Sequence, residues 1–273
     1  MNRNKLLLHL GVHKTATTHF QSRLFNSISS LQEVGVSYLG LEQTRKLITS
    51  KLFWEGEIEK KLCNFFNQNE FSLISDENII GGTDKIKNEL IYSDVVNRLK
   101  SLLDKLPVDL FAVHLTIRDP ESYLISRYCE YLRHYRFMSV SEYFDNFSLK
   151  SFSWLPLIHA IEMAAGKKVQ VTLFEDIFND ENAYLKKLTS VDINFAKASE
   201  GASIRRSKIS LESYRILEHL ADHYPRHMTQ RLVNMMDNNQ QRTKSNPLEP
   251  FSPELSRILK ENYEADKKAL GLV

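Results

Sequence analysis

Cysteine is scarce in this chain, and long hydrophobic runs are missing from it. Only Cys63 and Cys129 occur among 273 residues, too few for a disulfide framework or a cysteine-rich metal site. Both are expected to be small buried side chains in a reducing compartment. No stretch approaches the roughly 20 apolar residues that span a bilayer, and the apolar run at residues 6–10 is too short for a signal peptide. We therefore expect neither a transmembrane segment nor a secretory leader.

A strong excess of charge of either sign is also absent. The 36 basic and 34 acidic side chains leave a formal net charge of +2, which argues against a general nucleic-acid binder. Hydrophobic residues make up 42% of the chain, enough for a sizeable core. We expect one domain over residues 1–273, in which residues 210–273 form a mainly helical C-terminal extension.

Short apolar runs alternate with helical patterns over the first 190 residues. Strands are predicted at 6–10, 34–39, 71–75, 110–117 and 168–174, and helices from the Thr17 region to about Ser29 and at 55–68, 90–103, 120–135, 140–147, 154–165 and 176–188. Further helices are predicted at 211–222, 225–236 and 253–269, and residues 238–250 are expected to form a loop. This order predicts an α/β fold with a central parallel sheet of the P-loop type, flanked by helices. Ligands of such sheets bind at the carboxyl ends of the strands.

The turn after the first strand is the strongest candidate site. Gly11 allows a sharp bend, Lys14 supplies a charge, and Thr15, Thr17 and Thr18 can cap the helix that follows. A helix N-terminus offers unpaired N–H groups and a positive dipole end. The segment therefore predicts a phosphate or sulfate site, although an ordinary connection with a solvated lysine would also fit the residues.

This turn is not a Walker A loop, because Lys14 has no glycine directly before it. The strand followed by Gly11, His13, Lys14, Thr15, Ala16, Thr17 and Thr18 resembles the 5′-phosphosulfate loop of sulfotransferases that use 3′-phosphoadenosine 5′-phosphosulfate (PAPS), especially the bacterial and carbohydrate-type members. Ala16 replaces a glycine that is usual in that loop. An alanine fits there if its φ stays below zero.

A second motif follows the strand at 110–117. An arginine there is able to hold a phosphate with two hydrogen bonds. Arg118, Pro120, Ser126 and Tyr128 resemble the segment that binds the 3′-phosphate of PAPS in the same family, while an Arg118–Asp119 surface pair with a helix-starting proline would be the simpler interpretation. The basic segment around Arg205 and Arg206 resembles, more weakly, the part of the family that closes over the nucleotide. A solvated linker explains that segment equally well.

The resemblance implies transfer of a sulfuryl group from PAPS to a hydroxyl or amine, releasing adenosine 3′,5′-bisphosphate (PAP), without a metal. Lys14 would stabilise the leaving phosphate. A general base must take the acceptor proton. Glu77, directly after the strand at 71–75, is the first candidate, with His13 and Asp76 as alternatives; Glu77 could instead start a helix.

The acceptor is expected to be a saccharide or glycolipid. Arg127, Arg133, His134 and Arg136 lie among three tyrosines, and arginines with aromatic rings suit acidic glycans, although a solvated basic helix face has the same composition. Two other classes compete: a P-loop-type nucleotide kinase or phosphotransferase, and a non-catalytic nucleotide- or glycan-binding module. Members of the family in the Golgi usually carry an N-terminal anchor. Since no such anchor is seen here, we expect a cytoplasmic, bacterial enzyme.

Overall fold

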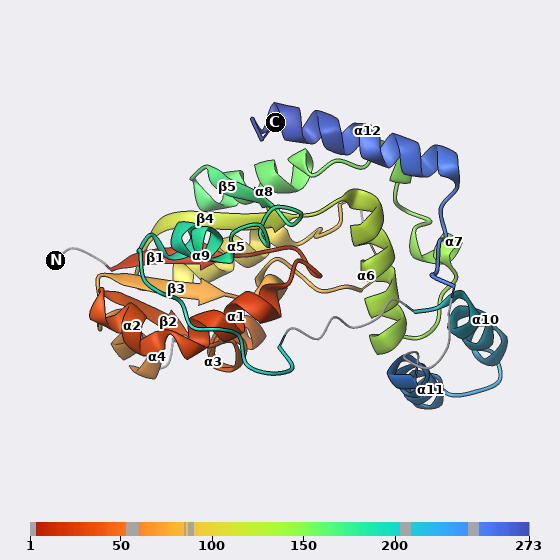
Figure 1. The fold of residues 1–273 in the computed structure, drawn as a ribbon, viewed down its shortest axis with the longest axis horizontal. Helices are drawn as coiled ribbons and strands as arrows, with labels where there is room; N and C mark the ends of the chain where they lie inside the picture. The colour runs from red at the N-terminus through yellow and green to blue at the C-terminus, as the bar shows by residue number, and fades with distance from the viewer. Residues whose placement is uncertain are drawn as a thin grey trace. The chain divides into compact units, whose positions relative to one another are not determined.

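The computed structural model describes residues 4–52, 60–84, 86, 90–202, 209–239 and 246–272. The chain divides into two compact units (Figure 1). The first unit comprises Met1–Gly81, Asp94–Arg118 and Leu155–Ser203, and the second comprises Gly82–Ser93, Asp119–Trp154 and Ile204–Val273. Each is described by itself below.

The first unit is built on a five-stranded sheet in the order β2-β3-β1-β4-β5, with all neighbouring strands parallel. The strands are β1 (Lys5–His9), β2 (Val36–Leu39), β3 (Phe71–Ser75), β4 (Asp109–Ile117) and β5 (Val169–Leu173). Leu6, Leu7 and Leu8 of the central strand are fully buried, as expected for a parallel strand covered on both faces. The predicted fold class, an α/β fold with a parallel sheet flanked by helices, is confirmed.

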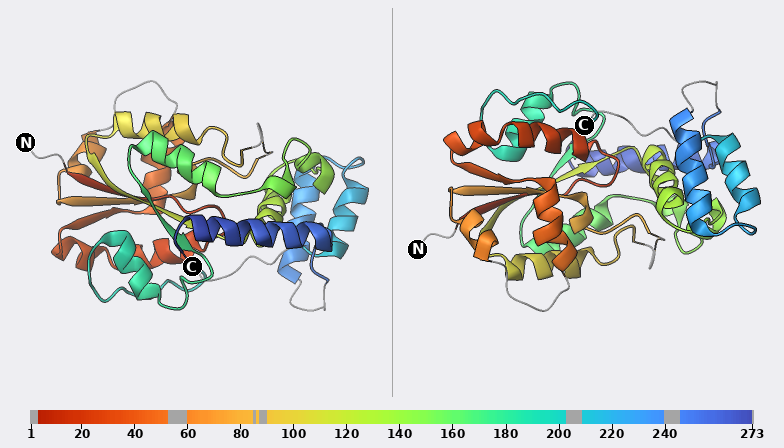
Figure 2. Two further views of the ribbon diagram at one scale, coloured as in Figure 1. Left: turned by 90° about the horizontal axis from the view of Figure 1, so that it is seen from above. Right: turned by 90° about the horizontal axis from the view of Figure 1, so that it is seen from below.

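Helices cover both faces of this sheet (Figure 2). On one face lie α1 (Thr17–Asn26), α2 (Ile28–Glu33) and α9 (Glu181–Thr189), whose apolar side chains pack on Leu7 and Leu73. On the other lie α5 (Val95–Lys105) and α8 (Leu155–Ala165). The remaining elements are α3 (Leu41–Leu47), the 3₁₀ turns η1 (Thr49–Lys51) and η2 (Glu77–Ile79), and α4 (Lys60–Phe66).

Several predicted helix bounds differ from the structure. The first helix, predicted to reach about Ser29, breaks at Ser27, whose hydroxyl donates back to the carbonyl of Arg23 at 2.8 Å; such bonds compete with the helical ladder. The helix predicted at 140–147 ends at Tyr143. The helix α3 was not predicted, because its sequence carries no clear apolar periodicity.

The second unit is helical. It contains α6 (Pro120–His134), α7 (Val140–Tyr143), η3 (Leu149–Ser151), α10 (Leu211–Leu220), α11 (Arg226–Asn239) and α12 (Pro253–Ala269). Asp119 caps α6 by accepting a hydrogen bond from the backbone N–H of Ser122 at 2.8 Å, and Pro120 occupies the first turn, where it has no hydrogen bond to lose. The three predicted C-terminal helices are all present within a few residues of their expected bounds.

Candidate active site

The loop between β1 and α1 is held by the neighbouring strand β4. The backbone N–H groups of Leu10 and Val12 donate to the carbonyls of His114 and Thr116 at 2.9 and 3.0 Å. Gly11 has a φ of 27°, and a Cβ built on it would lie 2.7 Å from a methyl group of Thr17. Only glycine fits there without a shift of its neighbours.

The N-terminus of α1 is left without a side-chain cap. The capping position is Ala16, and no acidic side chain lies in the first turn. The expected caps from the threonines are therefore wrong: Thr15 donates its hydroxyl to the carbonyl of Val12 at 2.6 Å instead, and Thr17 and Thr18 already belong to the helix. The dipole end and N–H groups of α1 are thus not offset by a side chain of the cap.

Two residues of the loop adopt left-handed backbone conformations. Lys14 has a φ of 70° and Ala16 a φ of 56°, so the condition under which an alanine was expected to fit at position 16 is not met. Left-handed geometry disfavours any side chain with a Cβ. Backbone that alternates in this way directs successive N–H groups into a common concavity, an arrangement that binds anions. The loop geometry therefore agrees with an anion site at a strained position.

Arg118 joins this loop from the end of β4. Its Nη1 donates to the carbonyl oxygen of Lys14 at 3.0 Å, and its guanidinium lies over the ring of Phe174, 4.6 Å from the centroid. Lys14 and Arg118, one residue from each of the two predicted phosphate-binding motifs, thus meet at the carboxyl edge of the sheet. In Figure 1 this edge is where β1 gives way to the loop before α1.

Three further residues were predicted to bind the nucleotide, namely Ser126, Arg205 and Arg206. Ser126 lies half-buried on α6, in the second unit, so its pairing with Arg118 stays a prediction. Arg205 and Arg206 lie outside the described residues.

The end of β3 contributes two carboxylates. Asp76 is fully buried and caps η2: its Oδ1 accepts from the backbone N–H of Asn78 at 3.0 Å and its Oδ2 from the hydroxyl of Thr49 at 2.7 Å. Burial raises the pKa of Asp76, with a further contribution from the charge of Glu77, and the hydrogen bonds and Arg45 partly oppose this. Asp76 therefore has a structural role at the start of η2.

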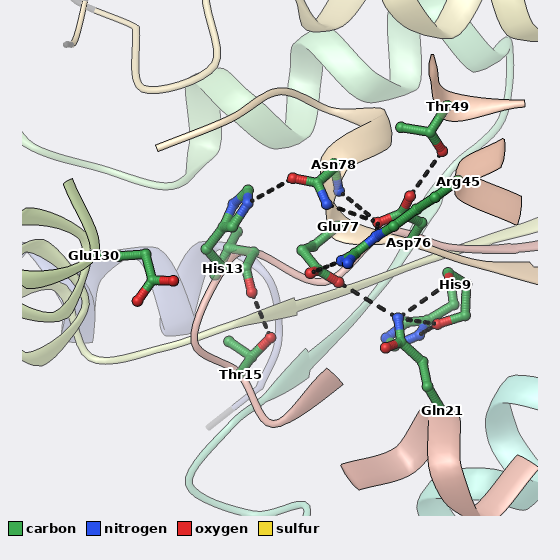
Figure 3. A network of polar contacts seen from close by, with 12 residues as sticks. His9, His13, Thr15, Gln21, Arg45, Thr49, Asp76, Glu77, Asn78 and Glu130 are labelled. Atoms are coloured by element: carbon green, nitrogen blue, oxygen red, sulfur yellow. Dashed lines mark hydrogen bonds and ion pairs between the residues drawn. The ribbon is translucent and has the colours of Figure 1, made fainter. Parts of the chain in front are cut away.

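Glu77 is held by two donors (Figure 3). Its Oε1 accepts from Nη2 of Arg45 at 2.8 Å, and its Oε2 from Nε2 of Gln21 at 3.4 Å. Beside it, Nε2 of His13 lies 3.2 Å from Oδ1 of Asn78. The structure thus brings Glu77, Asp76 and His13 to the edge of the sheet that also carries Lys14. Sequence reasoning missed Arg45, which lies on the unpredicted helix α3, and Gln21, a polar residue of α1 beyond the loop motif.

Two of the arginines that were predicted to form a basic face for an acidic glycan are buried. Arg127 is 1% exposed and donates to the carbonyls of Gly82, Asp84 and Ile91 at 3.0 to 3.3 Å. Arg133 is also buried and pairs with Glu130 at 3.3 Å. These two side chains therefore hold the second unit together and do not present a surface charge.

The described ranges contain neither a candidate metal site nor a helix that could span a membrane. No group of three or more His, Cys, Asp or Glu side chains there is arranged to hold a metal ion. Likewise, none of the helices in these ranges combines the length and the apolar character needed to cross a membrane.

Comparison with known proteins gave only distant likenesses. No protein-family model and no curated protein matches the chain. Among solved structures, a sulfotransferase from Alicyclobacillus acidocaldarius has a TM-score of 0.44 and 14% identity, over 86% of this chain and 97% of that one. A retinol dehydratase in complex with androsterone and the inactive cofactor PAP has a TM-score of 0.31 and 12% identity, over 93% and 84% of the two chains. At these values neither structure identifies the family of this chain.

Proposed function

We propose that this protein transfers a sulfuryl group from PAPS to a hydroxyl or amine of an acceptor. The observation that carries the proposal is the hydrogen bond of 3.0 Å between the guanidinium of Arg118 and the carbonyl of Lys14. Two motifs that are 104 residues apart in sequence, each resembling a phosphate-binding segment of PAPS-dependent sulfotransferases, meet beside the uncapped N-terminus of α1.

The residues at this edge fit the anionic groups of such a nucleotide. The backbone from Gly11 to Thr18, with Lys14, would hold the 5′-phosphosulfate, because an uncapped helix N-terminus and a left-handed loop suit a tetrahedral anion. Arg118 would hold the 3′-phosphate, where its planar guanidinium is able to make paired hydrogen bonds. Ser126, Arg205 and Arg206 are assigned to the nucleotide on the resemblance alone.

Different side chains have different roles in the proposed reaction. PAPS, when bound, supplies an activated sulfuryl group attached to a phosphate. Lys14 stabilises the negative charge that develops on that phosphate. Glu77 accepts the proton of the acceptor, with His13 as the alternative base. Each carboxylate oxygen has two lone pairs, so the bonds from Arg45 and Gln21 leave Glu77 capacity for an acceptor hydroxyl.

A saccharide is the acceptor class we propose, and it rests on the resemblance to carbohydrate-type members. The competing classes make different demands on the site. A kinase of the P-loop type needs Mg²⁺ and a strand-end acid that coordinates it, whereas the residue directly after β4 is Arg118. A binding module would need the nucleotide-binding residues without a base.

Calorimetry with PAP, ATP and AMP, each with and without Mg²⁺, tests the proposal. We expect PAP to bind tightly without metal and ATP and AMP to bind weakly. Preference for Mg²⁺-ATP would overturn the proposal in favour of the kinase. If PAP binds, ³⁵S-labelled PAPS is then incubated with a panel of saccharides and phenols. Tight PAP binding with no transfer to any acceptor would favour the binding module.

A further inference from the structure

Gln21 is a buried side chain that reaches from α1 to the proposed base. Its Nε2 lies 3.4 Å from Oε2 of Glu77, 3.1 Å from the carbonyl oxygen of Ser75 and 3.2 Å from the Ser75 hydroxyl. These three acceptors fix the orientation of the amide. In the flipped orientation, the amide oxygen would face a carboxylate and a carbonyl, which repel it.

This orientation leaves the amide oxygen of Gln21 buried without a hydrogen-bond partner in the described part of the chain. A buried acceptor without a partner lowers the stability of a fold. An apolar side chain of the same length would avoid that cost. Because the buried amide lowers stability, we expect its nitrogen to have another role. The carboxylate that this nitrogen contacts after β3 is that of Glu77.

A series of buried hydrogen bonds leads to Ser75, which accepts hydrogen bonds from Gln21. Ser75 Oγ lies 2.8 Å from Nδ1 of His9, whose Nε2 lies 3.0 Å from the hydroxyl of Tyr184. That hydroxyl lies 2.6 Å from Oγ1 of Thr116. Burial lowers the pKa of His9 to about 3, with a smaller contribution from the charge of His114, so the ring is neutral and carries one proton.

A neutral ring carries one N–H donor and one acceptor nitrogen, so His9 links the hydroxyls of Ser75 and Tyr184 in either tautomer. The Ser75 oxygens accept from Gln21, whose amide nitrogen is a donor only. Figure 3 shows Gln21 between His9 and Glu77, at the end of this series nearest the proposed base.

We infer that Gln21 is a positioning residue that fixes the Glu77 carboxylate for proton transfer. The inference rests on the proposed function. Gln21 acts through Glu77, and the hydrogen bonds of its amide nitrogen go to Ser75 and Glu77, outside the proposed phosphate-binding motifs. Its loss should therefore lower turnover without weakening the binding of the nucleotide.

The test compares Gln21→Met, which removes the amide at similar length, with Gln32→Met, which makes the same change at an exposed glutamine of α2. PAP affinity is measured by calorimetry, the unfolding temperature by circular dichroism, and kcat and KM by PAP formation from PAPS with the acceptor panel. We expect Gln21→Met to lower kcat about tenfold, since small misplacements of catalytic groups are costly. The KM for PAPS and the PAP affinity should stay unchanged. Gln32→Met should keep the wild-type kcat.

A double variant that combines Gln21→Met with Glu77→Gln tests whether Gln21 acts through Glu77. If Gln21 acts through Glu77, adding Gln21→Met to Glu77→Gln should lower kcat no further, and a full additional tenfold loss would overturn the inference. A folded Gln21→Met protein with wild-type kcat would also overturn it, as would equal losses of kcat in Gln21→Met and Gln32→Met. Wild-type protein that binds PAP but forms none from PAPS would instead contradict the proposed function itself, and the inference with it.

Discussion

The guanidinium of Arg118 donates a hydrogen bond to the main-chain carbonyl of Lys14 at 3.0 Å. The bond ties the end of β4 to a loop residue with a φ of 70°. It also brings the positive charge of Arg118 next to the residue that provides the charge of the loop. Because the guanidinium stacks on Phe174 as well, its position is defined from two sides. A phosphate bound beside this loop would therefore meet a charge that is already in place.

Replacement of Arg118 should weaken nucleotide binding. We expect Arg118→Ala to reduce PAP affinity about 10- to 100-fold, because a charge-assisted hydrogen bond contributes about 1.5–3 kcal/mol. Arg118→Lys should recover part of the loss, since it keeps the charge but not the planar pair of donors. Arg257→Ala removes an exposed arginine of α12 and serves as the control. Calorimetric PAP affinities that do not differ between Arg118→Ala and Arg257→Ala would contradict the assignment.

Replacement of Lys14 should affect transfer most. We expect Lys14→Ala to abolish detectable PAP formation from PAPS, since the charge that develops on the leaving phosphate loses its stabilising ammonium group. Lys5→Ala is the control, because Lys5 lies at the opposite end of β1 and pairs with Glu70 on the surface. A Lys14→Ala protein that forms PAP at the rate of Lys5→Ala would contradict the role of Lys14.

Replacement of Glu77 should separate binding from turnover. We expect Glu77→Gln to keep PAP affinity and to lower kcat at least about a hundredfold, because general-base catalysis contributes about 10²–10⁴. Glu70→Gln makes the same change at an exposed carboxylate and should behave as the wild type. If kcat stays normal in Glu77→Gln, the base must be another group, and His13→Gln is the next variant to measure.

The features of the fold and the candidate site that follow from local sequence patterns were predictable. Buried apolar runs identified the strands, and their alternation with helices placed Gly11, Glu77 and Arg118 at one edge. Arg45 was not predictable, because its helix α3 has no recognisable apolar pattern and its contact with Glu77 spans 32 residues. The φ of Ala16 was not predictable, since it depends on how the loop closes against β4 and not on the identity of the residue.

The strain at Ala16 leads to a prediction on stability. A left-handed conformation costs an alanine roughly 1–2 kcal/mol, and the greater freedom of glycine in the unfolded chain offsets about 0.4–1 kcal/mol of that. We therefore expect Ala16→Gly to leave the free energy of unfolding unchanged or raise it by up to about 1.6 kcal/mol. Ala160→Gly, inside α8, should lower it by about 1 kcal/mol. Urea unfolding of both variants provides the comparison, and equal losses would show that Ala16 is not strained.

Two buried histidines should make the protein sensitive to acid. Burial lowers the pKa of His9 to about 3 and that of His114 to about 4, with smaller contributions from the charges of His114 and Lys187 respectively. Unfolding returns the pKa of each ring to its ordinary value of 6.5. Between these limits the unfolded chain binds more protons, so stability is complete above pH 6.5 and falls as the pH drops towards 3 to 4.

His114 is the better of the two to replace. Both of its ring nitrogens are buried and have no hydrogen-bond partner in the described part of the chain, so His114→Leu should cost little at pH 7. Near pH 4.5 the same variant should be less destabilised than the wild type by about 2–3 kcal/mol, since one pKa unit corresponds to about 1.4 kcal/mol. His159→Leu makes the same change at an exposed histidine of α8 and should lose stability in acid as the wild type does. Urea unfolding of the three proteins from pH 7 to pH 4 measures how the free energy of unfolding of each depends on pH. If the curve of His114→Leu runs parallel to that of the wild type, protonation of this buried ring is not what destabilises the fold.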